Sequence, residues 1–377
     1  MRIVQASPFY DPHAGGVEAY VRRVTEELVR RGHELTVLTS RYDRALPETE
    51  ARAGYRIVRS RTLGVVLDTP IDVGATRSIR ALEADVVHLH YPPPLTSYFA
   101  TRGLRGRRTP VVLTYHCDLY RPGPAGRFLT ALYESLFLPS TLDRAQRIVA
   151  HTRTYAETST PLRGRPVEII PSAVDLERFR PEISGEPVRA RLGLTGRRVV
   201  LFTGRLVPHK GVDQILRALP RLPRDVALVV VGRGPRLDAL VRLAERLGVE
   251  ERVRFCPDVS DEQLPGYFRA ADLFVFPSRN RLEGFGLAVA EAMASGLPVV
   301  IADMPGVREV IAPGVEGLLT DPLLVGELAA RIQELLDDPA RRGAMGRAAR
   351  RRAEARYGVG TVVDSLIRLY ESLTAAG

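Results

Sequence analysis

The sequence predicts an α/β protein made of two doubly wound domains, in which parallel strands are covered by helices on both faces. Three observations predict this class. The chain has 377 residues, more than one hydrophobic core usually spans. Short apolar runs alternate with helical patterns in both halves, as expected for parallel sheets. Between the halves, residues 178–196 are rich in proline and glycine, which is typical of a linker.

The first half contains six short apolar runs that we interpret as strands. They cover residues 2–7, 34–39, 85–89, 110–115, 147–150 and 167–170. The clearest helix between them is predicted over residues 17–31, because apolar side chains recur there at helical spacing and Gly32 can end it. We place the first domain at residues 1–180 and the linker near residues 180–190.

The second half repeats the alternation and is predicted to form a domain over residues 190–356. Its strand candidates cover residues 198–203, 226–231, 253–255, 273–276 and 298–301. Doubly wound domains bind ligands at the carboxyl ends of their strands, so we expect two such edges to face a shared central cleft. A last helical pattern covers residues 357–373.

Composition limits the partners and the compartment. The net charge of +10 favours anionic partners, such as nucleotide diphosphates or anionic lipid headgroups, although an arginine-rich solvated surface explains it equally well. Nucleic acid is not predicted, because no zinc-finger, helix-turn-helix or RNP-type pattern occurs. The two cysteines give no disulfide framework, the polar N-terminus does not resemble a signal peptide, and no apolar run is long enough to span a membrane. We therefore expect a cytoplasmic protein.

The segment from Glu283 to Glu291 joins a strand to a helix through a glycine-rich turn. Backbone amides at a helix start can bind phosphate. Glu283 in the loop can then face a sugar, while Glu291 inside the helix can accept the hydroxyl pair of a ribose. Alone, such a turn is more often an ordinary loop. The amides predicted to bind a diphosphate belong to Phe285, Gly286 and Leu287.

A second loop supplies cations for the same phosphates. Arg205 and Lys210 lie between the strand over 199–203 and a helical pattern over 212–222 that Gly211 opens. Arginine offers a planar fork and lysine a point charge, and together they suit a diphosphate. A solvated basic loop is the alternative, but the carboxylate turn downstream favours a binding role.

These two motifs together resemble those of the retaining nucleotide-sugar glycosyltransferases of the GT-B fold. The loop over 204–211 and the Glu-x7-Glu segment over 283–291 are similar to the glycogen-synthase-like and phosphatidylinositol-mannosyltransferase-like branch, and the similarity extends from residue 1 to about residue 373. The resemblance implies two Rossmann-like domains facing a central cleft, with the helix over 357–377 packing back on the first domain.

The resemblance also implies roles for residues outside those motifs. Gly16 would lie under the donor diphosphate, His116 at the end of Thr114-Tyr115-His116 would contact the donor sugar, and Val259 would lie beside the nucleotide base. Pro257 stands where a glycine is usual in the family, so the base stays open. The acceptor-side candidates are Tyr10, His13 and Asp118, of which Asp118 can orient His116 or touch the acceptor.

Other patterns carry no function in this interpretation. Gly232 and Gly234 lack the third glycine of a dinucleotide fingerprint, so NAD is not predicted. His88 and His90 lack an obvious third metal ligand and are interpreted as structural. No Asp-x-Asp motif occurs, and cationic side chains can replace a metal, so we predict neither a metal nor another cofactor.

The implied reaction transfers a hexose, with retention, from a nucleotide-diphosphate sugar to a hydroxyl of a lipid-linked or glycan acceptor in cell-envelope or exopolysaccharide synthesis. The resemblance of residues 8–18 and 205–210 to the mannosyltransferase branch favours GDP-mannose, with a UDP-sugar as the alternative donor. The catalytic candidates are His116, Arg205, Lys210 and Glu283. The basic surface suits a peripheral enzyme on the inner face of the plasma membrane. A small soluble acceptor, an epimerase, a hydrolase, a phosphorylase and a non-catalytic nucleotide-binding or membrane-surface protein remain as alternatives.

Overall fold

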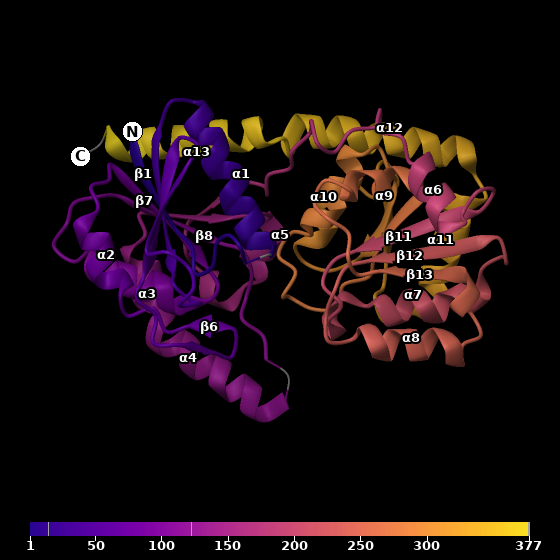
Figure 1. Cartoon of the computed structure of the whole chain (residues 1–377), viewed down its shortest axis with the longest axis horizontal. Helices are drawn as coiled ribbons and strands as arrows, with labels where there is room; N and C mark the ends of the chain where they lie inside the picture. The colour runs from indigo at the N-terminus through magenta and orange to yellow at the C-terminus, as the bar shows by residue number, and fades with distance from the viewer. Residues whose placement is uncertain (14, 122, 376–377) are drawn as a thin grey trace. The chain divides into compact units, whose positions relative to one another are not determined.

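The computed structural model describes residues 1–13, 15–121 and 123–375, and its chain forms two compact units (Figure 1). Unit 1 contains Met1–Ala173 and Val359–Gly377, and unit 2 contains Val174–Gly358. The division falls before the predicted linker at 180–190, because Val174 and Phe179 are fully buried in the core of unit 2. Residues 376–377 of the predicted last helix lie outside the described residues.

Unit 1 is built on an eight-stranded sheet in the order β10-β9-β8-β7-β1-β2-β4-β3, parallel except for β3, which is antiparallel to β4. Its strands are β1 Arg2–Ala6, β2 Glu34–Ser40, β3 Thr49–Arg52, β4 Tyr55–Ser60, β7 Val86–Tyr91, β8 Val111–Tyr115, β9 Arg147–Ala150 and β10 Val167–Ile169. In register, Ile3 of β1 pairs with Val86 of β7 on one side and with Leu35 of β2 on the other. The sequence analysis missed β3 and β4, whose residues are largely polar or charged.

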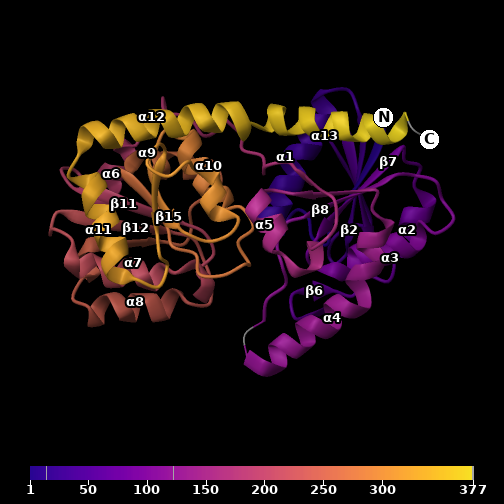
Figure 2. The same ribbon diagram turned by 180° about the vertical axis from the view of Figure 1, so that it is seen from behind.

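Helices cover both faces of this sheet (Figures 1 and 2). They are α1 Gly16–Arg30, α2 Ala75–Ala81, α3 Pro94–Gly103, α4 Gly123–Arg144, α5 Arg153–Thr158, the 3-10 turn Thr160–Leu162 and α13 Val359–Thr374. α1 ends as predicted, with Gly32 at φ +82° and its amide donating to Val29. α13 lies along α1, and Val363 and Leu366 share a buried cluster with Tyr20 and Val24.

A small antiparallel hairpin, β5 Val65–Val66 and β6 Thr69–Pro70, stands apart from the main sheet of unit 1. Leu67 and Asp68 at its tip have positive φ angles of 52° and 58°. Such values are uncommon for residues other than glycine and are found mainly in tight turns. The sequence analysis did not predict this hairpin.

Unit 2 contains a six-stranded, fully parallel sheet in the order β13-β12-β11-β14-β15-β16. Its strands are β11 Arg198–Thr203, β12 Val226–Val231, β13 Val253–Cys256, β14 Leu273–Phe276, β15 Val299–Ala302 and β16 Gly317–Thr320. Because strands such as β12 and β14 are buried on both faces, they appear in the sequence as continuous apolar runs. β16 was not predicted.

Most helices of unit 2 follow one of its strands. The helices are α6 Glu186–Leu192, α7 Val212–Ala218, α8 Leu237–Arg246, α9 Leu264–Ala270, α10 Leu287–Ala294, α11 Val325–Leu336 and α12 Pro339–Arg356, with 3-10 turns at Pro208–Lys210, Leu219–Arg221, Glu250–Arg252 and Val307–Val310. Of these, α6 precedes β11 and α12 follows α11. Within residues 1–13, 15–121 and 123–375, none of the helices has both the length and the apolar character needed to cross a bilayer.

Candidate active site

Two loops of unit 2 meet at the carboxyl ends of the neighbouring strands β11 and β14. The His209 carbonyl accepts a hydrogen bond from the Arg279 amide at 2.7 Å and one from the Ser278 hydroxyl at 3.2 Å. Gly211 has a φ of +73°, and a Cβ there would lie 2.2 Å from the Pro277 carbonyl oxygen. Glycine is therefore required at this position, because the two loops approach too closely for any side chain.

This approach brings Lys210 and Glu283 together as an ion pair. Their side chains are only 16% and 13% exposed, so the pair is well shielded from water. The Lys210 ammonium also lies 4.8 Å from the centre of the Phe276 ring, a favourable cation–π position. The structure thus joins two residues, 73 positions apart in the chain, that the sequence analysis assigned to one site.

The charges around this pair affect the neighbouring histidine. Burial, assisted by the Lys210 and Arg205 cations and opposed by Glu283, lowers the pKa of His209 to about 4. His209 is therefore neutral at pH 7. Arg205 is exposed on the same loop, so its guanidinium is accessible to an incoming anion.

The predicted phosphate-binding turn lies at the start of α10. Gly286 caps this helix with a φ of +85°, and its carbonyl accepts the Val289 amide at 2.8 Å. Phe285 is buried and packs edge-on against Tyr357, with ring centres 5.4 Å apart. The packing of Phe285 on Tyr357 therefore anchors the turn, and Leu287 follows it as the first helical residue.

Glu291 lies in the second turn of α10 and is 7% exposed. The other residues of the helix, LAVA before Glu291 and AMA after it, are apolar. Carboxylates are rarely buried, so one within an otherwise apolar helix stands out as a candidate for a functional role.

The loops after β12 and β13 complete this edge of the sheet. A Cβ at Gly232 would lie 2.1 Å from the Gly204 carbonyl oxygen, and one at Gly234 would lie 2.4 Å from the Leu206 carbonyl oxygen. Close loop packing explains why both positions are glycine, so no dinucleotide-binding role is needed to explain them. Val259 is half-buried against the core, and the next residue, Ser260, exchanges hydrogen bonds with Gln263 in a capping box before α9.

Unit 1 presents its candidates on the loop before α1 and at the carboxyl ends of β8 and β9. Gly16 begins α1, and a Cβ there would meet nothing within 4 Å. The His13 ring stacks on Phe9 with centres 4.2 Å apart and binds Glu18 through Nδ1 at 2.9 Å. Tyr10 does not fit the acceptor role predicted for it, because it is fully buried in the core with its hydroxyl 3.1 Å from that of Tyr55.

His116 belongs to a chain of buried histidines that runs across neighbouring strands. Its Nε2 lies 3.1 Å from His90 Nδ1, and its Nδ1 lies 2.9 Å from His151 Nε2. His151 Nδ1 lies 3.0 Å from the Ile170 carbonyl oxygen, and His90 Nε2 lies 2.6 Å from Gln5. Both ring nitrogens of His116 are therefore occupied by other histidines.

Burial keeps these rings uncharged. It lowers the pKa of His151 to about 4 and holds the pKa values of His90 and His116 well below the usual range, and the neighbouring histidines strengthen the effect on His90 and His116. His88 joins them through ring contact with His90, 4.5 Å between centres, and burial lowers its pKa to about 3. The interpretation of His88 and His90 as structural agrees with these contacts.

The neutral state fixes each tautomer. The Ile170 carbonyl can only accept, so His151 donates from Nδ1 and accepts at Nε2. His116 therefore donates from Nδ1 to His151 and accepts at Nε2. His90 in turn donates from Nδ1 to His116 and accepts at Nε2. His90 Nε2 consequently needs a donor. The Gln5 amide supplies one when its NH2 group faces His90, and this orientation gives a partner to a Gln5 nitrogen that otherwise has none among the described residues.

Two roles are predicted for Asp118, orienting His116 or touching the acceptor. Its Oδ1 accepts hydrogen bonds from the hydroxyls of Tyr115 at 3.0 Å and Ser159 at 2.6 Å. The His116 ring is held by His90 and His151. Both roles of Asp118 stay predictions.

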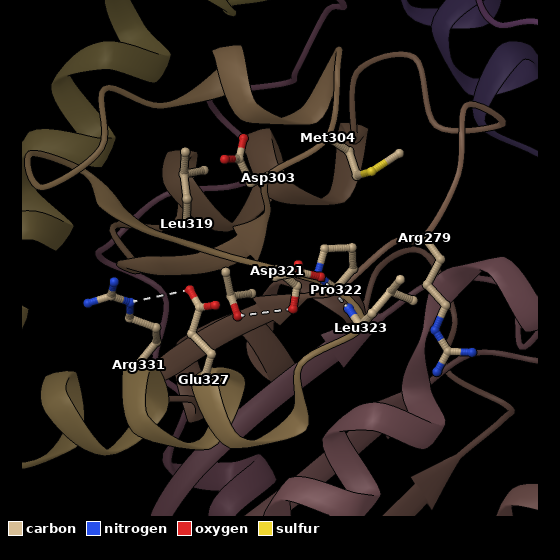
Figure 3. Close-up of a pocket in the computed structure, with 10 residues that line it drawn as sticks. Arg279, Asp303, Met304, Leu319, Asp321, Pro322, Leu323, Glu327 and Arg331 are labelled. Carbon is tan, nitrogen blue, oxygen red and sulfur yellow. Dashed lines mark hydrogen bonds and ion pairs between the residues drawn. The ribbon is translucent and has the colours of Figure 1, made fainter.

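The sequence analysis missed a cavity of about 480 Å³ where β15, β16 and α11 meet. Figure 3 shows Arg279 reaching it from the loop after β14 and Arg331 from α11 on the other side, where Arg331 pairs with Glu327. Arg279 also binds Asp213 at 2.6 Å. The sequence signal that could have pointed to Arg279 is its place in the loop that follows the strand over 273–276. Within the described part of the chain, no cluster of histidine, cysteine and acidic side chains is arranged to hold a metal.

The edge of unit 2 thus carries a lysine, an exposed arginine, two acidic side chains and a helix start. This combination on a parallel sheet defines an α/β domain suited to phosphorylated ligands.

Comparison with known proteins identifies the family. Residues 186–352 match "Glycosyl transferases group 1" and residues 14–178 match "Glycosyltransferase Family 4". A GDP-mannose-dependent alpha-(1-6)-phosphatidylinositol monomannoside mannosyltransferase of Mycolicibacterium smegmatis is 34% identical, over 90% of this chain and 91% of that protein. A D-inositol 3-phosphate glycosyltransferase of the same organism is 33% identical, over 97% and 89%.

Solved structures share the fold. Sucrose-phosphate synthase from Thermosynechococcus elongatus superposes with a TM-score of 0.85 at 24% identity, covering both chains completely. The Anabaena protein HepE in complex with UDP-glucose gives a TM-score of 0.78 at 22% identity, over 99% of this chain and 100% of its own.

The chain belongs to the group 1 glycosyltransferases of the GT-B fold, and it is a glycosyltransferase that uses a nucleotide sugar. The predicted fold class of two Rossmann-like domains and the predicted enzyme class are confirmed. Family membership favours transfer over the epimerase, hydrolase, phosphorylase and non-catalytic alternatives. The roles of the individual site residues stay predictions.

Proposed function

We propose that this enzyme transfers mannose, with retention of configuration, from GDP-mannose to a hydroxyl of a lipid-linked or glycan acceptor in cell-envelope synthesis. The observation that carries the proposal is the Lys210–Glu283 pair at the edge of unit 2, beside Arg205 and the start of α10. The 34% identity to a relative named as GDP-mannose-dependent supports the choice of donor. A UDP-sugar is the alternative.

The residues of unit 2 are assigned to the donor. Arg205 and Lys210 bind the diphosphate, whose negative charge grows as the bond to the sugar breaks, and the amides from Phe285 to Leu287 assist them. Glu283 holds sugar hydroxyls, Glu291 accepts the ribose hydroxyls, and Val259 borders the base. When the donor binds, its diphosphate replaces part of the ion-pair interaction between Lys210 and Glu283.

The residues of unit 1 are assigned to the acceptor and to the donor's sugar and diphosphate. Gly16 leaves room for the donor diphosphate at the start of α1. His13 and Asp118 contact the acceptor. Because both ring nitrogens of His116 are occupied, we assign its sugar contact to the main chain.

The chemical step balances without a metal or another cofactor. The bond between the anomeric carbon and the diphosphate oxygen breaks, and its electron pair stays on the diphosphate. The acceptor oxygen forms its new bond to the same face of the anomeric carbon, which retains configuration. The proton of the acceptor hydroxyl passes to the departing phosphate oxygen, and the two cations stabilise the charge that remains.

The reaction is proposed to occur at the cytoplasmic face of the plasma membrane, with the enzyme bound peripherally. A lipid-linked acceptor and a net charge of +10 support this location. A second candidate is transfer to a small soluble acceptor, which is favoured by the relatives named D-inositol 3-phosphate glycosyltransferase.

Ligand-induced stabilisation tests the donor. GDP should raise the melting temperature more than UDP or ADP, because binding to the folded state alone stabilises it by mass action. Incubation with GDP-mannose and either phosphatidylinositol mannosides or inositol phosphate, followed by NMR of the product's anomeric centre, separates the two acceptor classes and tests retention. Failure of all three nucleotides to bind would contradict the proposal.

A further inference from the structure

Large apolar side chains that remain exposed are concentrated in two segments of unit 1. Among the described residues, all but Val315, Leu323 and Leu324 lie either near the β5–β6 hairpin or on and just before α4. We call the following eight residues the apolar surface: Leu63, Val65, Val66, Leu67, Phe128, Leu129, Leu132 and Leu136. Leu63 is 63% exposed and Phe128 is 68% exposed, so these side chains are not partly covered core residues.

The two segments lie side by side. The Arg121 guanidinium donates to the Leu67 carbonyl at 2.6 Å, which ties the tip of the hairpin to the chain entering α4. Both views show β6 next to α4 (Figures 1 and 2). The exposed apolar residues of the hairpin thus belong to a segment that lies beside the helix carrying the others, and exposed apolar groups gathered in this way mark interaction sites.

α4 is apolar on two sides, and only one of them is packed. Phe128, Leu132 and Leu136 recur every four residues and so form one exposed stripe. On the other side, Leu138 and Leu142 are buried in the core of unit 1. An apolar helix face is normally packed against another surface, so the exposed stripe of α4 lacks the cover that its buried side has.

Positive charge flanks the apolar surface. Arg61 and Arg127 are exposed and Arg121 is half-exposed beside it. Within residues 61–68 and 119–137, the acidic residues are Asp68 and Glu134, and burial together with Asp118 raises the pKa of Glu134 to about 7. An apolar area with a positive rim complements the surface of a membrane that carries anionic headgroups.

We propose that the apolar surface docks unit 1 on a lipid bilayer with anionic headgroups. The leucines, valines and Phe128 enter the boundary between headgroups and acyl chains, while the flanking arginines bind lipid phosphates. A symmetric dimer through this surface would instead bring equal sets of arginines together with few carboxylates to compensate. The inference deepens and rests on the proposed function, since a lipid-linked acceptor is reached from such a surface.

Sedimentation with vesicles tests the docking surface. The full chain should bind vesicles of phosphatidylcholine with phosphatidylglycerol and bind vesicles of phosphatidylcholine alone much more weakly. The double variant Phe128→Ser with Leu132→Ser should lower the partition coefficient at least about tenfold, because two apolar side chains no longer leave water. The matched control, Val315→Ser with Leu324→Ser, removes two exposed apolar residues of unit 2 and should bind like the wild type.

Three results would overturn the docking surface. They are absence of vesicle binding by the wild type, undiminished binding by the double variant, and a dimer in light scattering that the same variant dissociates. Circular dichroism should show that both serine variants fold, as expected for exposed positions. Stabilisation by GDP without vesicles is measured in parallel: nucleotide binding without vesicle binding rejects only this surface, and vesicle binding without nucleotide binding rejects the proposed donor site.

Discussion

The carboxyl ends of the parallel strands carry very different side chains in the two units. In unit 1, His90, His116 and His151 form a buried, uncharged chain that ends on Gln5 and on a backbone carbonyl. In unit 2, Lys210 and Glu283 form an ion pair next to the exposed Arg205. The comparison teaches that one topology can hold either a self-satisfied polar network or a set of charges that a ligand can recruit.

Acidification should produce the largest difference between the two units, because it should destabilise unit 1 more than unit 2. The histidine pKa values are lowered in the folded state, so the unfolded chain binds more protons once the pH falls below about 6.5. Stability is therefore fully present above that pH and is lost as the pH falls toward the folded pKa values. At about pH 5, each histidine that stays neutral should lower the free energy of unfolding by about 2 kcal/mol.

Urea unfolding at several pH values measures this loss, and hydrogen exchange locates it. The amides of β7 and β8 should lose protection before those of β12 and β14, since the buried histidine chain belongs to unit 1 alone. Equal loss in both units, or a free energy of unfolding independent of pH, would break the comparison.

Removing the positive charge of Lys210 should lower the turnover rate and leave folding intact. We expect Lys210→Ala to lower kcat about 100-fold to 1,000-fold, because a preorganised group that stabilises the leaving diphosphate is lost. Arg205→Ala should act in the same direction. Initial rates with GDP-mannose measure the effect.

The matched control is Arg224→Ala. Arg224 is an exposed arginine just before β12, at the opposite end of the strands. This variant should keep wild-type kcat. Near-normal turnover by Lys210→Ala would show that the ion pair is structural.

The close loop packing at the edge of unit 2 can be tested by adding one methyl group. Gly232→Ala combines a φ of +133° with a Cβ position 2.1 Å from the Gly204 carbonyl oxygen, so it should cost about 3 kcal/mol of folding free energy. Gly248→Ala is the control, with a φ of +63° and open space, and should cost about 1 kcal/mol. If urea unfolding gave the same loss of free energy for both variants, the loops would have to shift readily to make room for the added methyl group.

The tautomer assignment in unit 1 predicts a smaller effect. Gln5→Leu removes the donor to His90 and should cost about 1 to 3 kcal/mol, because a buried acceptor loses its partner. It should also shift the ring 15N resonances of His90. Gln214→Leu, which removes a buried amide bonded to the Pro322 carbonyl at 3.0 Å in unit 2, is the control and should leave those resonances unchanged.

Local patterns predicted most strands and the helices that border the site. The strands over 198–203, 226–231 and 273–276 have the predicted bounds, because a strand buried on both faces must be apolar throughout. The patterns failed at β4 and β16, where short or mixed sequences carry no such signal. Tyr10, which was placed on the acceptor side, lies in the core.

The sequence by itself determined the alternation of strands and helices, the glycine-rich turn before Glu291 and the basic loop of Arg205 and Lys210, because each depends on neighbouring residues. Only the tertiary structure decided which distant side chains meet. The strand order β9-β8-β7-β1 lines up His151, His116, His90 and Gln5, and the adjacency of β11 and β14 joins Lys210 to Glu283. Strand order is set by long-range packing of whole faces, which no local spacing records.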